Sequence, residues 1–104
     1  MRSGSRPITS AKTKFDPGKV VVTRGVNHFM ADDEKFAAFV FESLRRHLSG
    51  DWGELCNEDK EANETALLDG DRLFSAYKSS GLPPIWIITE RDRSATTILL
   101  PDEY

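Results

Sequence analysis

The sequence predicts an α+β fold, with two helices packed on a three- to four-stranded antiparallel sheet whose last strands form a C-terminal meander. Three observations predict this class. Apolar residues recur at helical spacing in segment 36–48. Short β-rich runs at 73–78, 85–89 and 95–100 are joined by short connections, which is typical of antiparallel neighbours. The length of 104 residues allows one core, so a multidomain enzyme is excluded.

The first half of the chain contains one expected strand and one strong helix signal. Asp16-Pro17-Gly18 is a turn signal, and the β-branched run Lys19 to Thr23 is expected to supply the fourth strand. The apolar segment 26–30 is short, so we expect one helical turn or a loop there. The acidic residues 32–34 favour a helix N-terminus, and Ser49-Gly50 ends that helix.

The second half contains a lighter helix and the β-rich region. Residues 51–55 are expected to form a compact loop, and Asn57 is expected to cap a second helix over 58–68. Pro83-Pro84 imposes an extended backbone before segment 85–89. Because that segment is apolar throughout and too short for a helix, we expect a central strand covered on both faces.

The expected core combines the apolar face of the first helix with inward-facing strand residues. It consists of Phe36, Val40, Phe41, Leu44, Leu73, Ile85, Ile87, Ile98 and Leu100. Trp52 and Trp86 are expected at the seam between helices and sheet, where an indole ring can be buried while its N–H finds an acceptor.

The net charge of −3 conceals two oppositely charged parts. Residues 1–24 carry six basic side chains and one acidic one, whereas residues 25–104 carry eight basic and sixteen acidic ones. Residues 1–14 are polar and rich in Ser, Pro and Gly, so we expect a disordered basic arm followed by one domain over 15–104. Such an arm can make weak, salt-sensitive contact with nucleic acid, although termini of this composition are usually inert. The acidic body argues against a wide DNA-binding face.

The sequence also disfavours membrane, metal and cofactor chemistry. No apolar run approaches the roughly 20 residues that a membrane helix needs, so we expect a cytoplasmic protein without membrane contact. Cys56 is the only cysteine, which excludes an intramolecular disulfide and a thiolate metal site. His28 and His47 are far apart and belong to no metal-binding motif, and no glycine-rich phosphate loop is present. We therefore expect neither a metal nor a cofactor.

The densest polar cluster lies near the end of the expected central strand. Glu90 follows that strand, Arg93 lies in the next turn, and Arg72 precedes the first strand of the meander. A carboxylate and two arginines on one sheet face could act as general base and phosphate clamp in a metal-free ribonuclease. The simpler interpretation is an ion-paired turn with solvated arginines, which requires no ligand.

Several segments of the chain carry a family resemblance. They are Gly50 to Leu55, Arg72 to Tyr77, Ile85 to Glu90, Asp92-Arg93-Ser94, Thr96-Thr97 and Leu99 to Tyr104. Together they resemble a family of small bacterial plasmid-related proteins of uncharacterised function, many of which are labelled subunit M of a type I restriction endonuclease. The resemblance covers residues 17–104 and implies an accessory protein of mobile DNA. This chain has neither the cofactor loop nor the Asn-Pro-Pro-aromatic motif of a methyltransferase.

Two functions of different classes are consistent with these observations. The first is a non-enzymatic accessory or interaction protein, whose contact with a protein partner would lie around His47, Asp51, Trp52 and Tyr104. The alternative is a small ribonuclease-like toxin using Glu90, Arg93 and Arg72, since the order of helices before a sheet loosely resembles the microbial ribonuclease and toxin fold. Convergence of those three side chains in one cleft would favour the alternative.

Overall fold

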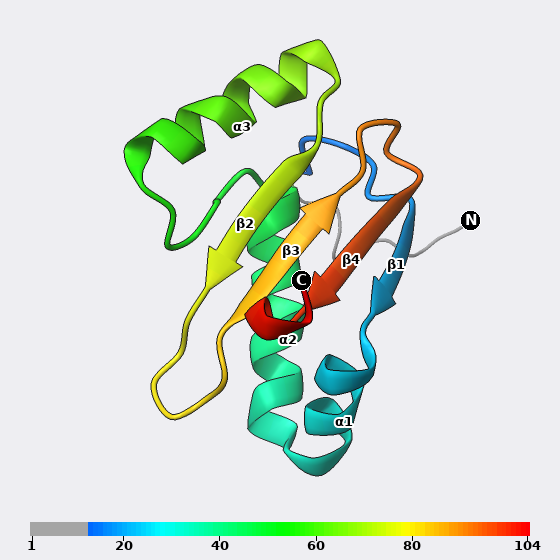
Figure 1. Ribbon diagram of the computed structural model, residues 1–104, viewed down its shortest axis with the longest axis vertical. Coiled ribbons are helices and arrows are strands. Elements are labelled where there is room, and N and C mark those ends of the chain that lie inside the picture. The colour runs from blue at the N-terminus through cyan, green and yellow to red at the C-terminus, as the bar shows by residue number, and fades with distance from the viewer. Residues whose placement is uncertain (1–12) are drawn as a thin grey trace, which may run out of the picture.

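The computed structural model describes residues 13–104; residues 1–12, most of the expected basic arm, lie outside the described part. The elements in chain order are β1 (Lys19–Val22), α1 (Arg24–Asp32), α2 (Glu34–Leu48), α3 (Asn57–Asp69), β2 (Leu73–Tyr77), β3 (Ile85–Thr89), β4 (Ala95–Leu99) and the short 3₁₀ helix η1 (Pro101–Glu103). The α+β class is confirmed, with one sheet and helices on its faces and edge (Figure 1). No helix within residues 13–104 is both long and apolar enough to cross a membrane.

The sheet is mixed rather than purely antiparallel, so that part of the prediction is wrong. The strand order is β1-β4-β3-β2, and the last three strands form the expected meander. β1 pairs in parallel with β4, with Lys19 opposite Ala95 and Val22 opposite Ile98. The rule that short connections give antiparallel neighbours applies only to consecutive strands. α1, α2 and α3 separate β1 from the meander, so no short connection sets its direction.

Within residues 13–104 three α-helices are present where two were expected, because residues 24–32 form α1. Its N-terminus is stabilised by Thr23, directly before the helix, and by Glu103, which is distant in the sequence. The Thr23 hydroxyl accepts a hydrogen bond from the Val26 N–H, and the Glu103 carboxylate accepts from the Gly25 N–H at 2.9 Å and from the Thr23 hydroxyl at 2.5 Å. An acidic group at a helix N-terminus stabilises it. This partner is 78 residues away from Gly25, so local sequence could not reveal it.

The prediction that Asn57 caps α3 is also wrong. The helix begins at Asn57 itself, and Cys56 occupies the N-cap position without a side-chain hydrogen bond to the helix. The acidic residues Glu58 and Asp59 in the first turn complement the helix dipole instead.

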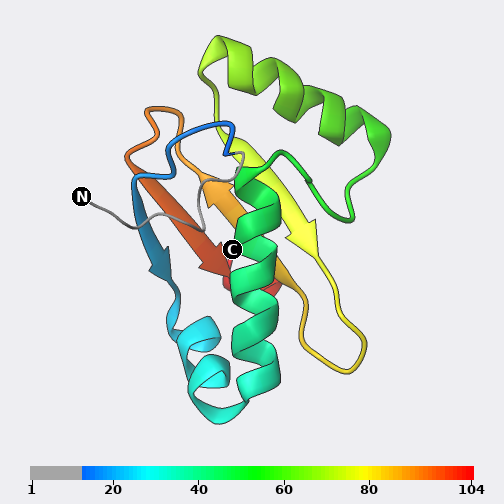
Figure 2. The ribbon, with the colours of Figure 1, turned by 180° about the vertical axis from the view of Figure 1, so that it is seen from behind.

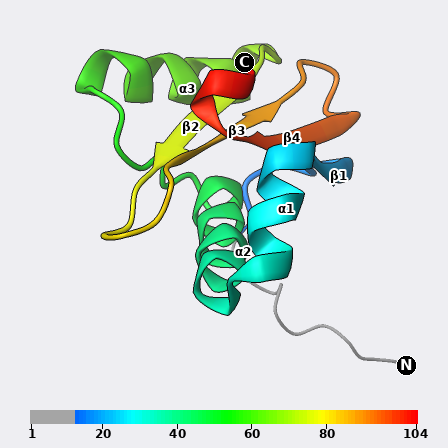
Figure 3. The same ribbon diagram turned by 60° about the horizontal axis from the view of Figure 1, so that its bottom comes forward.

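The main core lies between the sheet and the pair α1 and α2, which cover one face (Figure 3). Six expected core residues are confirmed as buried, namely Phe36, Val40, Leu73, Ile85, Ile87 and Ile98, while Leu44 and Leu100 are half-buried against the core. Phe41 is 63% exposed, which contradicts its assignment to the core. The buried side of α2 follows Phe36, Val40, Ser43 and His47, and Phe41 lies about 100° around the helix from Val40.

The outer edge of β2 is closed by α3 and by the loop before it (Figure 2). The Asn63 side chain donates to the Phe74 carbonyl at 2.6 Å and accepts from the Phe74 N–H at 3.1 Å. Next along the strand, the Ala76 carbonyl accepts from the Glu54 N–H and the Ala76 N–H donates to the Trp52 carbonyl. The backbone groups of Phe74 and Ala76 at this edge are therefore already paired.

Candidate functional site

The candidate site is the sheet face opposite α1 and α2, which we call the outer face (Figure 3). Side chains alternate between the two faces of a strand. The register places Phe74 beside Ile88 and Ala76 beside Trp86 on the outer face, whereas Ser75 and its partner Ile87 lie on the inner face. Large apolar residues thus occupy both faces, although helices α1 and α2 cover only one of them.

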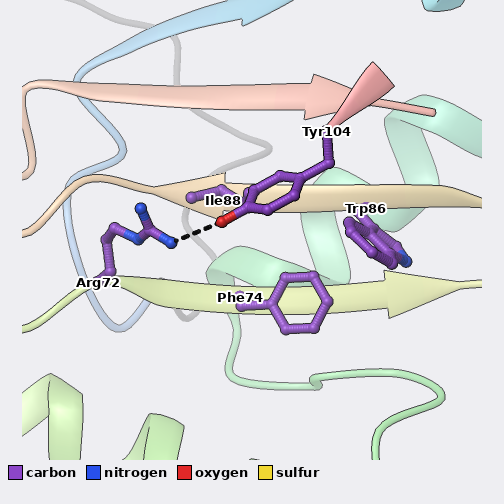
Figure 4. Close-up of a pocket in the computed structure, with 5 residues that line it drawn as sticks. All are labelled: Arg72, Phe74, Trp86, Ile88 and Tyr104. Carbon is purple, nitrogen blue, oxygen red and sulfur yellow. Dashed lines mark hydrogen bonds between the residues drawn. The ribbon is translucent and has the colours of Figure 1, made fainter. Parts of the chain in front are cut away.

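An aromatic cluster made of Phe74, Trp86 and Tyr104 lies on this face (Figure 4). The Trp86 ring is 5.1 Å from the Phe74 ring and 5.7 Å from the Tyr104 ring, with edge-on geometry in both pairs. Tyr104 is 71% exposed and lies over Ile88, which is only 7% exposed. η1 turns the chain back over the sheet and brings Tyr104 to this position (Figure 1).

Arg72 completes the cluster from the other end of β3. Its Nη2 donates to the Tyr104 hydroxyl at 3.2 Å, and this hydrogen bond raises the pKa of the guanidinium above its usual value. Together with the aromatic cluster and Ile88 it lines a hollow of about 310 Å³ (Figure 4). The remaining donors of the guanidinium are exposed, so one cationic group borders an otherwise apolar hollow.

Two further hollows are linked to the first through shared lining residues. A hollow of about 400 Å³ shares Phe74 and Trp86 with the first. A third, of about 380 Å³, shares Pro84 and Pro101 with the second. Phe29 of α1 also lines it, so this hollow lies at the end of the sheet beside α1 rather than on the outer face itself. We call the three together the outer groove. Its charged lining residues are Arg72 in the first hollow, Glu54 and Lys78 in the second, and Asp102 in the third.

The two tryptophans differ in their hydrogen bonding. Trp52 is 3% exposed, and its indole N–H donates to the Glu64 carboxylate at 2.8 Å. Trp86 is half-buried, and no group within residues 13–104 accepts a hydrogen bond from its indole N–H. In Figure 4 the indole nitrogen lies on the side of the ring away from Arg72. Trp86 also lines the second hollow. A half-buried donor of this kind is available to a ligand.

His47 lies on the inner side of the sheet in a chain of buried polar groups. Its Nδ1 is 2.6 Å from the Ser75 hydroxyl, and its Nε2 is 2.9 Å from the Thr89 hydroxyl. Thr89 is in turn 2.7 Å from the Thr96 hydroxyl, which donates to the Pro17 carbonyl at 2.8 Å. His47, Ser75, Thr89 and Thr96 are all 1% exposed or less.

The Pro17 carbonyl determines the direction of every hydrogen bond in this chain. A carbonyl only accepts, so the single Thr96 hydroxyl proton points at Pro17 and Thr96 must accept from Thr89. Thr89 must then accept from His47, which assigns the proton of the neutral imidazole to Nε2 and makes Nδ1 the acceptor of the Ser75 hydroxyl. Burial lowers the pKa of His47 to about 3, and the nearby Arg93 guanidinium contributes to this shift.

The contact patch expected around His47, Asp51, Trp52 and Tyr104 is not a single surface. His47 and Trp52 lie in the interior, with ring centroids 5.6 Å apart, and cannot touch a partner directly. Asp51 is exposed and paired with Arg46, whose hydrogen bond lowers the pKa of the carboxyl. Tyr104 lies on the outer face, on the opposite side of the sheet from His47. Only Tyr104 belongs to the outer groove.

Arg93, a catalytic candidate in the ribonuclease alternative, has a structural role in the fold. Its Nη1 donates to the carbonyl oxygens of Asp71, Glu90 and Arg91, and its Nη2 donates to that of Ala66. The guanidinium therefore ties the β3–β4 turn to the end of α3.

This placement separates the two arginines. Arg93 lies 5.8 Å from the Phe15 ring, and Phe15 packs against His47 on the inner side, whereas Arg72 bonds Tyr104 on the outer face. Glu90 is exposed at the strand end. Of the three residues, only Arg72 lines any of the three hollows described above.

Sequence reasoning missed Phe74 and Trp86 as site residues. The apolar strand 85–89 was interpreted as covered on both faces, whereas an outward-facing Trp is also the signal of an exposed binding face.

Within residues 13–104, no three His, Cys, Asp or Glu side chains are grouped closely enough to hold a metal ion. In comparisons with protein-family models, curated proteins and solved structures, none matches this chain.

Proposed function

We propose that this chain is a non-enzymatic accessory protein that binds a segment of a partner protein in the outer groove. The single observation that carries the proposal is the aromatic cluster, which leaves Trp86 half-buried and Tyr104 71% exposed beside the Arg72 guanidinium. Trp, Tyr and Arg are the residues that dominate binding energy at protein interfaces. A mobile-element setting is part of the proposal and rests on the family resemblance alone.

The charge of residues 25–104 favours a protein partner over a nucleic acid. Residues 25–104 carry twice as many acidic as basic side chains, eight basic against sixteen acidic. Affinity for nucleic acid comes largely from Lys and Arg that neutralise phosphates, and Arg72 and Lys78 are the only cations lining the groove within the described residues. A peptide contributes apolar contacts and needs only one or two charged pairs.

Site-specific photocrosslinking tests the proposal. A photoreactive amino acid is placed at Tyr104 and, as the matched control, at Phe41, which is 63% exposed on α2. In the native host we expect a defined partner crosslinked at position 104 and not at position 41. The crosslinked partner segment is then synthesised and its affinity measured by calorimetry. Trp86→Ala should weaken binding by about thirtyfold or more, as for an interface hot spot, while Phe41→Ala leaves it unchanged.

Two results would contradict the proposal. One is equal crosslinking at positions 104 and 41, or none at either. The other is turnover of RNA by the purified chain that is lost in Glu90→Ala, since such activity would establish the enzymatic alternative.

A further inference from the structure

We infer that the ligand of the outer groove is a proline-rich peptide in the extended polyproline II conformation, with an acidic residue at the Arg72 end and a basic residue at the Asp102 end. This inference rests on the proposed function and specifies which class of partner segment the groove accepts. Three independent features of the groove lead to it.

The first feature is the closed edge of β2, which excludes binding by strand addition there. Strand addition needs unpaired backbone groups at a sheet edge. The Asn63 side chain occupies both backbone groups of Phe74, and the Trp52–Glu54 loop occupies those of Ala76. A partner at this face must therefore bind across the side chains of the outer face.

The second feature is the Trp86 indole N–H, which has no acceptor among the described residues and lies on the side of the ring away from Arg72, while Trp86 also lines the second hollow. A helical ligand uses its mid-chain carbonyl groups internally and has none to offer. A polyproline II segment has no internal hydrogen bonds, so every carbonyl along it can accept. The donor thus selects an extended ligand over a helical one.

The third feature is the composition and charge of the lining. Aromatic-lined grooves bind proline-rich segments, whose preformed shape limits the entropy lost on binding. Phe74, Trp86 and Tyr104 line the first hollow, and Phe29 lines the third. Arg72 lies in the first hollow and Asp102 in the third, whereas the second hollow is lined by one residue of each charge, Glu54 and Lys78. The groove is therefore electrically polar, which favours one direction of the peptide chain.

Selection from a display library of short random peptides tests the inference on the full chain. Peptides retained by the wild type and lost by Trp86→Ala are sequenced, and the strongest are synthesised for titration by tryptophan fluorescence. We expect enrichment of proline at alternating spacings, with an acidic residue toward one end and a basic one toward the other. Trp86→Phe keeps the ring contacts and removes the donor, so it should weaken binding by about fivefold.

Charge reversal tests the polarity of the site. Arg72→Glu should lose selected peptides that carry the acidic residue and accept their charge-swapped versions. Arg91→Glu is the matched control, because Arg91 is exposed, paired with Asp71 at 3.3 Å and outside the groove. Arg91→Glu should leave the affinity unchanged.

The outcomes separate this inference from the proposed function. Selected peptides that need Trp86 but show no enrichment of proline would overturn the polyproline II ligand and leave the proposed function standing. Peptides indifferent to Trp86, or no retained peptides at all, would overturn both. Unchanged affinity in Trp86→Phe would overturn the role of the indole donor.

Discussion

The buried His47 makes the stability of the domain depend on pH. In the unfolded chain an imidazole has a pKa of about 6.5, whereas burial lowers the pKa of His47 to about 3 in the folded protein. Between these values the unfolded chain binds a proton that the folded chain does not. His47 therefore leaves the free energy of unfolding at its full value above about pH 6.5. The free energy of unfolding decreases as the pH falls from there toward about 3, because the unfolded chain takes up the proton.

The size of the effect follows from the two pKa values. Lowering the pH from about 8 to about 5 should reduce the free energy of unfolding by about 2 kcal/mol. Urea unfolding curves across this range, followed by circular dichroism, measure the change. His47→Gln should flatten the dependence, even though it lowers stability at neutral pH by disturbing the bonds to Ser75 and Thr89.

The control is His28→Gln, because the His28 side chain is 70% exposed and its nearest acid is Asp32 at 3.6 Å. This variant should keep the pH dependence of the wild type. An identical slope in His47→Gln and wild type would refute the reasoning, as would a folded-state His47 resonance that titrates near pH 6.5. Nitrogen shifts of the imidazole should also show the proton on Nε2, as the direction of the Pro17 hydrogen bond requires.

Three further predictions concern the framework around the groove. Gly53→Ala should lower the unfolding midpoint far more than Gly81→Ala. Both glycines have positive φ, but a Cβ at Gly53 would lie 2.0 Å from the Ala76 carbonyl oxygen, whereas a Cβ at Gly81 would contact nothing within 4 Å. Arg93→Ala should be less stable than Arg93→Gly by about 1 kcal/mol in urea, because both lose the carbonyl contacts while only alanine keeps the strain of φ 59°. Glu103→Ala should lower the unfolding midpoint more than Asp102→Ala, because the Glu103 carboxylate holds η1 against α1. Peptide binding should weaken in both variants, since η1 positions Tyr104 and Asp102 lines the groove.

The elements with strong local signals could be predicted from the sequence. α2 has a regular apolar period and acidic residues at its start, and the meander has short connections between β-rich runs. What local signals could not show are contacts between distant segments. α1 depends on Glu103, and β1 takes its direction from β4, which lies more than 70 residues further along the chain.

The site was harder to predict than the fold for a physical reason. An apolar strand indicates burial without telling which face is covered, so the same residues predict a core strand or a binding face. Polar side chains such as Arg93 and His47 have the chemistry of a candidate site, yet Arg93 bonds turn carbonyls and His47 bonds buried hydroxyls. Trp86 and Phe74, which the sequence did not mark as site residues, form the aromatic cluster together with Tyr104.

The most direct test of the outer groove follows the two indole N–H resonances in a nitrogen–proton correlation spectrum, assigned with Trp86→Phe. The partner segment identified at Tyr104 is added to the labelled chain. We predict that the Trp86 indole signal shifts on binding, while the Trp52 signal stays in place because its N–H is held by Glu64. An unmoved Trp86 signal at saturation, or shifts centred on Phe41 and the exposed side of α2, would contradict the assignment of the outer groove as the binding site.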